Sequence, residues 1–345
     1  MKKLSVVFLT VVLIAAPSCT KSGNASSGTP SQATAPKVKP VIIQIGYENN
    51  PGEPIDLAIH EWKRLAEERS NGSIEIQIFP SSQLGSKNEL IDQMLAGIGV
   101  ITLADGAFYA DRGVDDLGIT LGPYLFGSWD EAWKLIASDW WQTQMKLLEV
   151  RGLKMLAANW IYGDRHTLTK RPIRTVEDFK GLKLRVPNNL IQIKGTEVMG
   201  ATPTPLPLGE VYTALQTGVV DGVENPLPVL YGGKFHEVAK YLTLDAHIKL
   251  LTSWFCGTAF FNTLTPEQQS VLIETGLEAG LYNNKLQTQV AEETIAKFKA
   301  EGVEVIEVDM AQFQAQAKPF YNLPEFQSKW SPGLFETVSK AKATP

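Results

Sequence analysis

The sequence predicts an α/β fold in two domains, and three observations lead to this prediction. Short apolar runs rich in β-branched residues alternate with stretches whose apolar residues recur at helical spacing, as in largely parallel sheets covered by helices on both faces. The 345 residues are 44% hydrophobic, which is enough for one large or two ordinary domains. A helical pattern over about 265–299 would span roughly 50 Å, so it is expected to cross between domains.

The first β-α-β unit begins after residue 40. Residues 41–46 form a short apolar run closed by glycine, which predicts a buried strand. A helix is expected at about 53–66, where a proline stands near the start and Ile59 and Trp62 share the apolar face. Isoleucines then alternate with polar residues over 74–78, which predicts a second strand.

The alternation continues to residue 199, and the long helix follows later. Thr265, Pro266 and Gln268 supply its N-cap, a proline in the first turn and a capping-box partner. No linker-like segment occurs after residue 40, so the chain is expected to pass between the domains more than once through short hinges. The elements predicted in between are a helix over 86–96, a strand over 100–103, one longer helix over 130–150, strands over 153–157 and 182–186, a capping box at 175–178 and a helix over 191–199.

The N-terminus has the pattern of an export signal. Two lysines precede an apolar run that is too short to span a membrane, so residues 1–18 are interpreted as a signal peptide. The small residues before Cys19 resemble a bacterial lipobox, in which the cysteine is lipidated and the chain is cut before it, although Pro17 is unusual there. The alternative is a soluble export signal cleaved near Ser18.

Residues 19–40 carry almost no large apolar side chain and are expected to form a flexible tether. With a lipid on Cys19, the folded part would lie in the periplasm or at the cell surface and be anchored to the membrane without entering it.

Charge and cysteine content exclude several classes of protein. The 32 basic and 37 acidic side chains give a net charge of −5, which provides no excess positive field for nucleic acid. Removal of residues 1–18 leaves 30 basic side chains and a net charge of −7. Two cysteines are too few for a disulfide framework or a cysteine-based zinc site. Cys256 lies in an apolar setting and is expected to be a structural thiol.

A search for catalytic motifs favours binding over catalysis. The four histidines are scattered and form no zinc-protease motif, and there is no nucleophile elbow, phosphate loop or complete dinucleotide fingerprint. We therefore expect no metal and no cofactor.

The segment from 160 to 228 is dense in features that a solvated surface does not need. Arg185 stands within a short apolar strand and just before a proline, and a buried arginine there would require an anion. The most particular runs are GDRH at 163–166, GLKLRVP at 181–187, GATPTPLP at 200–207, EVYTALQTGVVDG at 210–222 and ENP at 224–226.

These runs closely resemble the DctP family, the extracytoplasmic solute-binding subunits of tripartite ATP-independent periplasmic (TRAP) transporters. The resemblance extends from about residue 41 to 325. It implies a periplasmic-binding-protein-like (Venus-flytrap) fold, in which two α/β domains joined by hinge strands and a long helix close over an organic acid. The expected domain I is 41–162 plus about 251–285, and domain II is 163–250 plus about 286–345.

The resemblance also implies a binding site. Arg185 would form a two-pronged salt bridge with the ligand carboxylate, Arg165 would be a second cation beside it, and Asn225 would donate a hydrogen bond to the same carboxylate. The guanidinium suits this task because two parallel charge-assisted hydrogen bonds match a carboxylate, whereas lysine offers a point charge. The alternative is that Arg165 and Arg185 pair with acids of the protein itself.

Domain I is expected to supply the contacts that select the ligand. Glu48 and Asp105 follow strand ends, and their carboxylates suit hydroxyl donors better than further carboxylates, which favours a hydroxy or sugar acid over a plain dicarboxylate. Either acid could instead cap a helix or pair with an arginine. Leu208 is expected to pack against the ligand, and Trp160 and Trp254 belong either to the core or to the cleft wall.

The function predicted is that of a receptor, not an enzyme. It would capture an organic acid and deliver it to the membrane subunits of a TRAP transporter. The alternative is an extracytoplasmic enzyme or a sensory module acting on a sugar acid.

Overall fold

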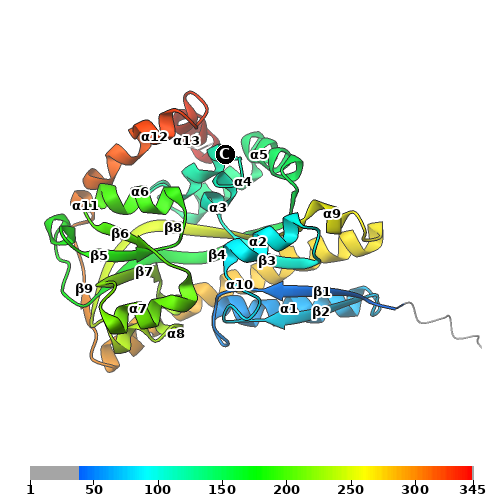
Figure 1. Cartoon of the computed structure of the whole chain (residues 1–345), viewed down its shortest axis with the longest axis horizontal. Coiled ribbons are helices and arrows are strands. Elements are labelled where there is room, and N and C mark those ends of the chain that lie inside the picture. Colours follow the sequence, from blue (N-terminus) through cyan, green and yellow to red (C-terminus); the bar gives the residue numbers. More distant parts are fainter. Residues whose placement is uncertain (1–38, 344–345) are drawn as a thin grey trace, which may run out of the picture. The chain divides into compact units, whose positions relative to one another are not determined.

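The computed structural model describes residues 39–343. The signal peptide predicted over 1–18, Cys19 and nearly all of the tether predicted over 19–40 lie outside the described residues. Within the described range, one nine-stranded mixed sheet has the order β2-β1-β3-β8-β4-β7-β5-β6, with β9 paired to β8, and helices cover its faces (Figure 1). The α/β class is confirmed.

The first part of the sheet is parallel. β1 pairs with β2 from Val41 opposite Ile74 and with β3 on its other edge. The predicted β-α-β unit is present in its expected order. The apolar face of α1 packs Ile59 and Trp62 into the core. The elements are β1 (Val41–Gly46), α1 (Pro54–Arg69), β2 (Ile74–Phe79), α2 (Lys87–Leu95), β3 (Val100–Ala104) and α3 (Gly106–Ala110).

The part at the opposite edge of the sheet is also parallel. β5 pairs with β6 and β7. The capping box predicted at Thr175 and Asp178 is present, but it opens a single 3-10 turn, Val176–Phe179. The elements are β5 (Lys183–Val186), α6 (Leu190–Met199), β6 (Thr202–Pro205), α7 (Val211–Thr217), β7 (Gly222–Pro226) and α8 (Leu227–Gly232).

Two long strands join these parts. β4 (Leu153–Thr169) and β8 (Tyr241–Gly257) are 17 residues each and pair antiparallel through the centre of the sheet (Figure 1). Their register shifts between Ile161 and Gly163, and Gly163 has φ +131°, a conformation that favours glycine. Composition and spacing predicted only the first five residues of β4 as a strand.

The single helix predicted over 130–150 is two helices in the structure. They are α4 (Trp129–Ala137) and α5 (Asp139–Val150). Ser138 between them is extended, with φ −76° and ψ 158°, and its hydroxyl accepts a hydrogen bond from the Trp141 amide at 3.3 Å. Because Ser138 caps the second helix, it ends the first, and the apolar periodicity on both sides conceals the break.

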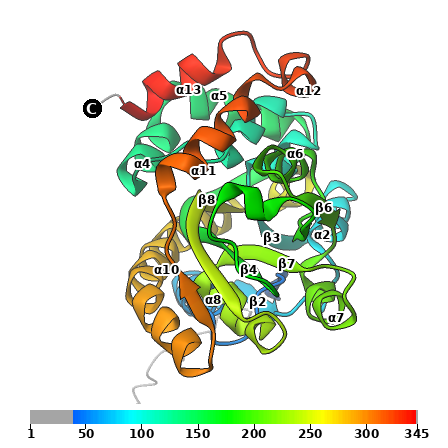
Figure 2. The ribbon, with the colours of Figure 1, turned by 90° about the vertical axis from the view of Figure 1, so that its left-hand side faces the viewer.

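The long helix is confirmed as α10 (Pro266–Ala300), 35 residues with a capping box from Thr265 and Gln268. It packs against α1, β4 and α8, and so runs past both parallel parts of the sheet (Figure 2). Trp62 and Trp160 donate their indole N–H groups to Leu272 and Gly276 carbonyls of α10 at 3.2 and 3.0 Å. Trp160 and Trp254 have no exposed surface and contact each other, so both belong to the core.

The C-terminal elements return across the molecule. α13 packs against α4 (Figure 2). The Lys342 ammonium of α13 donates a hydrogen bond to the Glu131 carboxylate of α4 at 2.7 Å. Cys256 in β8 is buried, and burial raises the pKa of its thiol to about 12, as expected of a structural cysteine. The remaining elements are α9 (Thr258–Phe261), β9 (Glu304–Ile306), α11 (Met310–Ala317) and α12 (Pro324–Gln327), followed by α13 (Leu334–Ala343).

Candidate functional site

The six side chains singled out in the sequence meet around one pocket. Glu48 and Asp105 come from the ends of β1 and β3, and the other four come from β4, β5, β7 and the turn after β6. Side chains at the carboxyl ends of parallel strands commonly form such sites. The pocket encloses ≈ 350 Å³, including its open part, and its lining consists of Glu48, Lys87, Leu103, Asp105, Tyr162, Arg165, Arg185, Pro187, Leu208, Asn225, Leu250 and Thr252.

Arg185 is a buried cation without a carboxylate partner. Its side chain is 2% exposed, and no carboxylate of residues 39–343 lies within ion-pair distance of it. Its Nε and Nη2 atoms donate to the Leu206 carbonyl at 2.9 and 2.6 Å. Three of its five N–H groups remain, two on Nη1 and one on Nη2, which is enough for a two-pronged contact. Burial lowers the pKa of Arg185 to about 10, so an anion in the pocket would offset a real energetic cost.

Arg165 has a carboxylate partner in the protein. Its Nη2 donates to Glu224 Oε1 at 2.6 Å and to the Glu224 carbonyl at 2.9 Å, and its Nε donates to Glu224 Oε2. From the sequence, either arginine could have paired with an acid of the protein. Among the described residues, Arg165 does so and Arg185 does not. Arg165 still lines the pocket, so it can contribute to its potential.

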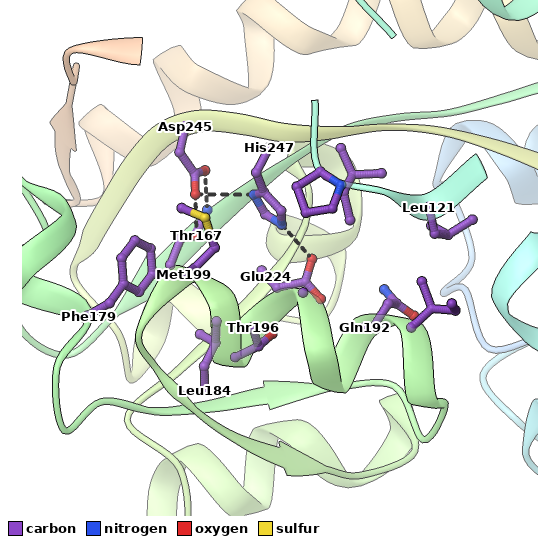
Figure 3. Close-up of a pocket in the computed structure, with 14 residues that line it drawn as sticks. Leu121, Thr167, Phe179, Leu184, Gln192, Thr196, Met199, Glu224, Asp245 and His247 are labelled. Atoms are coloured by element: carbon purple, nitrogen blue, oxygen red, sulfur yellow. Dashed lines mark hydrogen bonds and ion pairs between the residues drawn. The ribbon is translucent and has the colours of Figure 1, made fainter. Parts of the chain in front are cut away.

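Glu224, the partner of Arg165, begins a row of buried polar groups that continues through His247 to Asp245 (Figure 3). His247 Nε2 lies 3.2 Å from Glu224 Oε2, and its Nδ1 lies 3.1 Å from Asp245 Oδ2. Asp245 in turn accepts hydrogen bonds from the amide and hydroxyl of Thr167 at 3.1 and 2.7 Å. These groups border a second, largely apolar cavity beside α6.

The charged groups in this row hold one another in their charged forms. Burial favours the neutral form of Glu224, but Arg165 and His247 outweigh it and hold the pKa of Glu224 at about 2. Burial likewise opposes the charge on His247, while Asp245 and Glu224 raise the pKa of His247 to about 9. Glu224 is therefore a carboxylate at neutral pH and holds the Arg165 guanidinium in place.

The acidic side of the pocket contains Glu48 and Asp105. Asp105 is the N-cap of α3 and accepts a hydrogen bond from the Ala107 amide at 3.1 Å, which is the capping alternative stated above. Burial raises the pKa of Asp105, although nearby Lys87 and Arg165 oppose the rise. Glu48 Oε2 lies 3.6 Å from Lys87 Nζ. Both acids nevertheless line the pocket.

Lys87, Tyr162 and Thr252 are lining residues that sequence reasoning did not identify. Lys87 is the first residue of α2, and its ammonium lies 4.8 Å from the centre of the Phe108 ring. A lysine at a helix start carries no recognisable signal. Tyr162 stands two residues from Trp160, within the segment that the sequence marked as unusual, and donates its hydroxyl to Asn49 Oδ1 at 3.3 Å.

Asn225 and Leu208 complete the wall. Asn225 is 3% exposed, and its carboxamide makes no hydrogen bond within the described part of the chain, so it can serve a ligand. Leu208 is buried and supplies apolar surface together with Leu103 and Leu250.

The pocket has the chemistry of a receptor for a small anion. It combines one unpaired guanidinium, an unpartnered carboxamide and two carboxylates in a partly open pocket with buried walls. Among residues 39–343, no group of three or more histidine, cysteine or acidic side chains could hold a metal ion. None of the helices described is long and apolar enough to cross a membrane.

The chain belongs to the bacterial extracellular solute-binding protein family 7, whose family model matches residues 45–329. The sialic acid-binding periplasmic protein of Vibrio cholerae is 34% identical over 269 residues, 76% of this chain and 81% of that protein. A TRAP periplasmic solute-binding protein of Ochrobacterium anthropi, solved with bound L-fuconate, is 44% identical with a TM-score of 0.85 over 88% of this chain and 100% of that one. Another, from Actinobacillus succinogenes with bound L-galactonate, is 40% identical with a TM-score of 0.84 over 88% and 99%.

These similarities show the class of protein to which the chain belongs. The chain is a periplasmic solute-binding receptor of the TRAP type with the two-domain periplasmic-binding-protein fold, as the sequence predicted. The two similar structures from Ochrobacterium anthropi and Actinobacillus succinogenes hold organic acids, L-fuconate and L-galactonate. Because the family consists of receptors, the enzyme alternative is set aside.

Proposed function

We propose that the ligand is a hydroxylated monocarboxylic acid of the aldonate type. The observation that carries this proposal is the single unpaired cation, Arg185. Arg165 is neutralised by Glu224, and Lys87 lies beside Glu48, so the pocket offers one full positive charge to an incoming anion. A second carboxylate would meet Asp105 and Glu48, and like charges between buried walls repel more strongly than they do in water.

In the proposed complex, the carboxylate lies against Nη1 and Nη2 of Arg185 and accepts a further hydrogen bond from Asn225. Arg165 adds a positive potential beside it. Glu48 and Asp105 accept hydrogen bonds from hydroxyl groups at the other end, and Leu208 packs against the carbon chain. L-fuconate and L-galactonate, the ligands bound in two similar structures, are hydroxylated monocarboxylic acids of this kind.

Closure around the ligand would be a population shift between open and closed forms. We propose domain I as 41–162 with about 251–285, and domain II as 163–250 with about 286–345. The register shift between Ile161 and Gly163, opposite Leu251 and Leu250, supports hinges at these boundaries.

Calorimetry with three matched compounds tests the ligand class. L-galactonate is expected to bind at least about 30-fold more tightly than succinate, whose second carboxylate would meet Glu48 and Asp105. Galactitol lacks the carboxylate and is expected not to bind, because loss of a buried charge pair costs about 2–5 kcal/mol. Mass spectrometry should recover the bound acid unchanged. Succinate binding as tightly as L-galactonate would refute the sugar-acid proposal, and conversion of the acid would reinstate the enzyme alternative.

We also propose that Cys19 is lipidated and that residues 19–40 tether the receptor to the membrane. In cells that express the full chain, the wild type is expected in the membrane fraction and the Cys19→Ser variant in the soluble fraction. The intact mass of the purified wild type should show acyl chains on a protein that begins at Cys19. A mass corresponding to an unmodified chain cleaved near Ser18 would contradict the proposal.

A further inference from the structure

A buried carboxylate outside the ligand pocket lies directly against the backbone of α8. Glu53, the residue before α1, is 5% exposed. Gly232 is the last residue of α8, and a Cβ atom built there would lie 2.5 Å from Glu53 Oε1 and 3.0 Å from its Cδ. Only glycine permits this approach without displacing the carboxylate.

Glu53 also holds the loop that carries Glu48 to the ligand pocket. Its Oε2 accepts a hydrogen bond from Asn49 Nδ2 at 2.7 Å, and its Oε1 accepts one from the Asn50 amide at 3.0 Å. No lysine, arginine or histidine of residues 39–343 forms an ion pair with it. Neither Glu53 nor Gly232 lines the ligand pocket, although Gly232 lines the open groove beside it, which shares Glu48 and Leu208 with that pocket.

In the domain division proposed above, Glu53 belongs to domain I and Gly232 to domain II. We propose that these two residues form a closure contact, which sets the balance between open and closed receptor and thereby controls affinity without touching the ligand. The inference rests on the proposed function, since it requires a cleft that opens and closes. The apparent affinity of such a receptor scales with the fraction in the competent, closed form.

The contact makes closure sensitive to pH. Burial raises the pKa of Glu53 to about 7, although Asn49 and Asn50 oppose the rise. The titratable groups near it are Asp56 on α1, the Tyr47 phenol just after β1 and the Tyr162 phenol on β4. In an open cleft, solvent would return its pKa towards the ordinary 4.5. The closed form therefore binds a proton more tightly than the open form, so protonation favours closure. Affinity should increase roughly tenfold when the pH falls from 8 to 5.5.

Calorimetric titration of the full-length receptor with L-galactonate at pH 5.5 and 8 tests the inference. Glu53→Gln, which mimics the protonated carboxyl group, should bind at pH 8 about as tightly as the wild type does at pH 5.5 and should lose the pH dependence. Gly232→Ala should weaken binding about tenfold or more, while the melting temperature without ligand stays close to that of the wild type. X-ray scattering of that variant with subsaturating ligand should show a more open average form.

Gly209→Ala is the matched control in the same groove. A Cβ at Gly209 would lie 3.6 Å from Ser82 Oγ, an ordinary contact, so binding should be unchanged. Wild-type affinity in Gly232→Ala, or a pH dependence that persists in Glu53→Gln, would refute the closure contact while leaving the proposed ligand class intact. Failure of the wild type to bind any sugar acid would instead refute the proposed function.

Discussion

Replacement of Arg185 by methionine is expected to abolish binding of L-galactonate and L-fuconate. The substitution removes the one unpaired cation of the pocket together with the three N–H groups left for a ligand. Breaking a buried, hydrogen-bonded charge pair costs about 2–5 kcal/mol, which corresponds to roughly 30-fold to several-thousand-fold in Kd. Calorimetry measures the affinity, and the ligand-induced increase in Tm should disappear.

The ligand-free Arg185→Met variant should keep a cooperative thermal transition. Loss of the hydrogen bonds to Leu206 destabilises the fold, but removal of a buried, unpaired charge opposes that loss. Arg185→Lys retains a charge without the two-pronged geometry, so it should also lose most of the affinity. Lys183→Met, an exposed position on the same strand, serves as the control and should bind normally. Wild-type affinity in Arg185→Met would mean that the anion binds elsewhere.

The elements that the sequence predicted well are those with local signals. The strand at Val41–Gly46 has the predicted bounds, because a β-branched run ending in glycine defines it without reference to the rest of the chain. The long helix has a capping box and a proline at its start. The break at Ser138 was missed because a serine inside an apolar period looks like one more exposed helical position. The antiparallel pairing of β4 with β8 joins residues far apart in the sequence, from Leu153 with Gly257 to Thr169 with Tyr241, and no local pattern encodes it.

The candidate site likewise contains residues that the sequence could predict and contacts that it could not. Arg185 could be identified because a strand and a proline fix its position, and the family resemblance added the residues of its motif. Whether each arginine had a protein partner could not be predicted, because Glu224 reaches Arg165 only through the pairing of β7 with β4. His247 joins Glu224 from β8 for the same reason. In the proposed complex, an acidic chain binds an anion because recognition is local to one unpaired guanidinium in a pocket with buried walls.

Replacement of Glu224 by glutamine is expected to lower the free energy of unfolding by about 3–5 kcal/mol, since removal of one partner leaves the other charge buried and uncompensated. Arg165, which is 3% exposed, would lose its carboxylate, and His247 would lose one of its two acidic neighbours. Urea unfolding at pH 7 measures the change. Glu210→Gln, an exposed acid of the same region, is the control and should change stability by less than about 0.5 kcal/mol.

The pH dependence of stability provides a second test of Glu224. Its pKa is depressed in the folded protein, so its contribution to stability is fully present above the ordinary value near 4.5 and is lost as the pH falls towards about 2. His247 has the opposite sign: its raised pKa contributes stability below about 6.5, and this contribution is lost as the pH rises through about 9. Because the two charges stabilise each other, Glu224→Gln should reduce the loss of folding stability at alkaline pH as well as the loss at acid pH. A variant that keeps both slopes of the wild type would show that other groups stabilise Arg165 and His247.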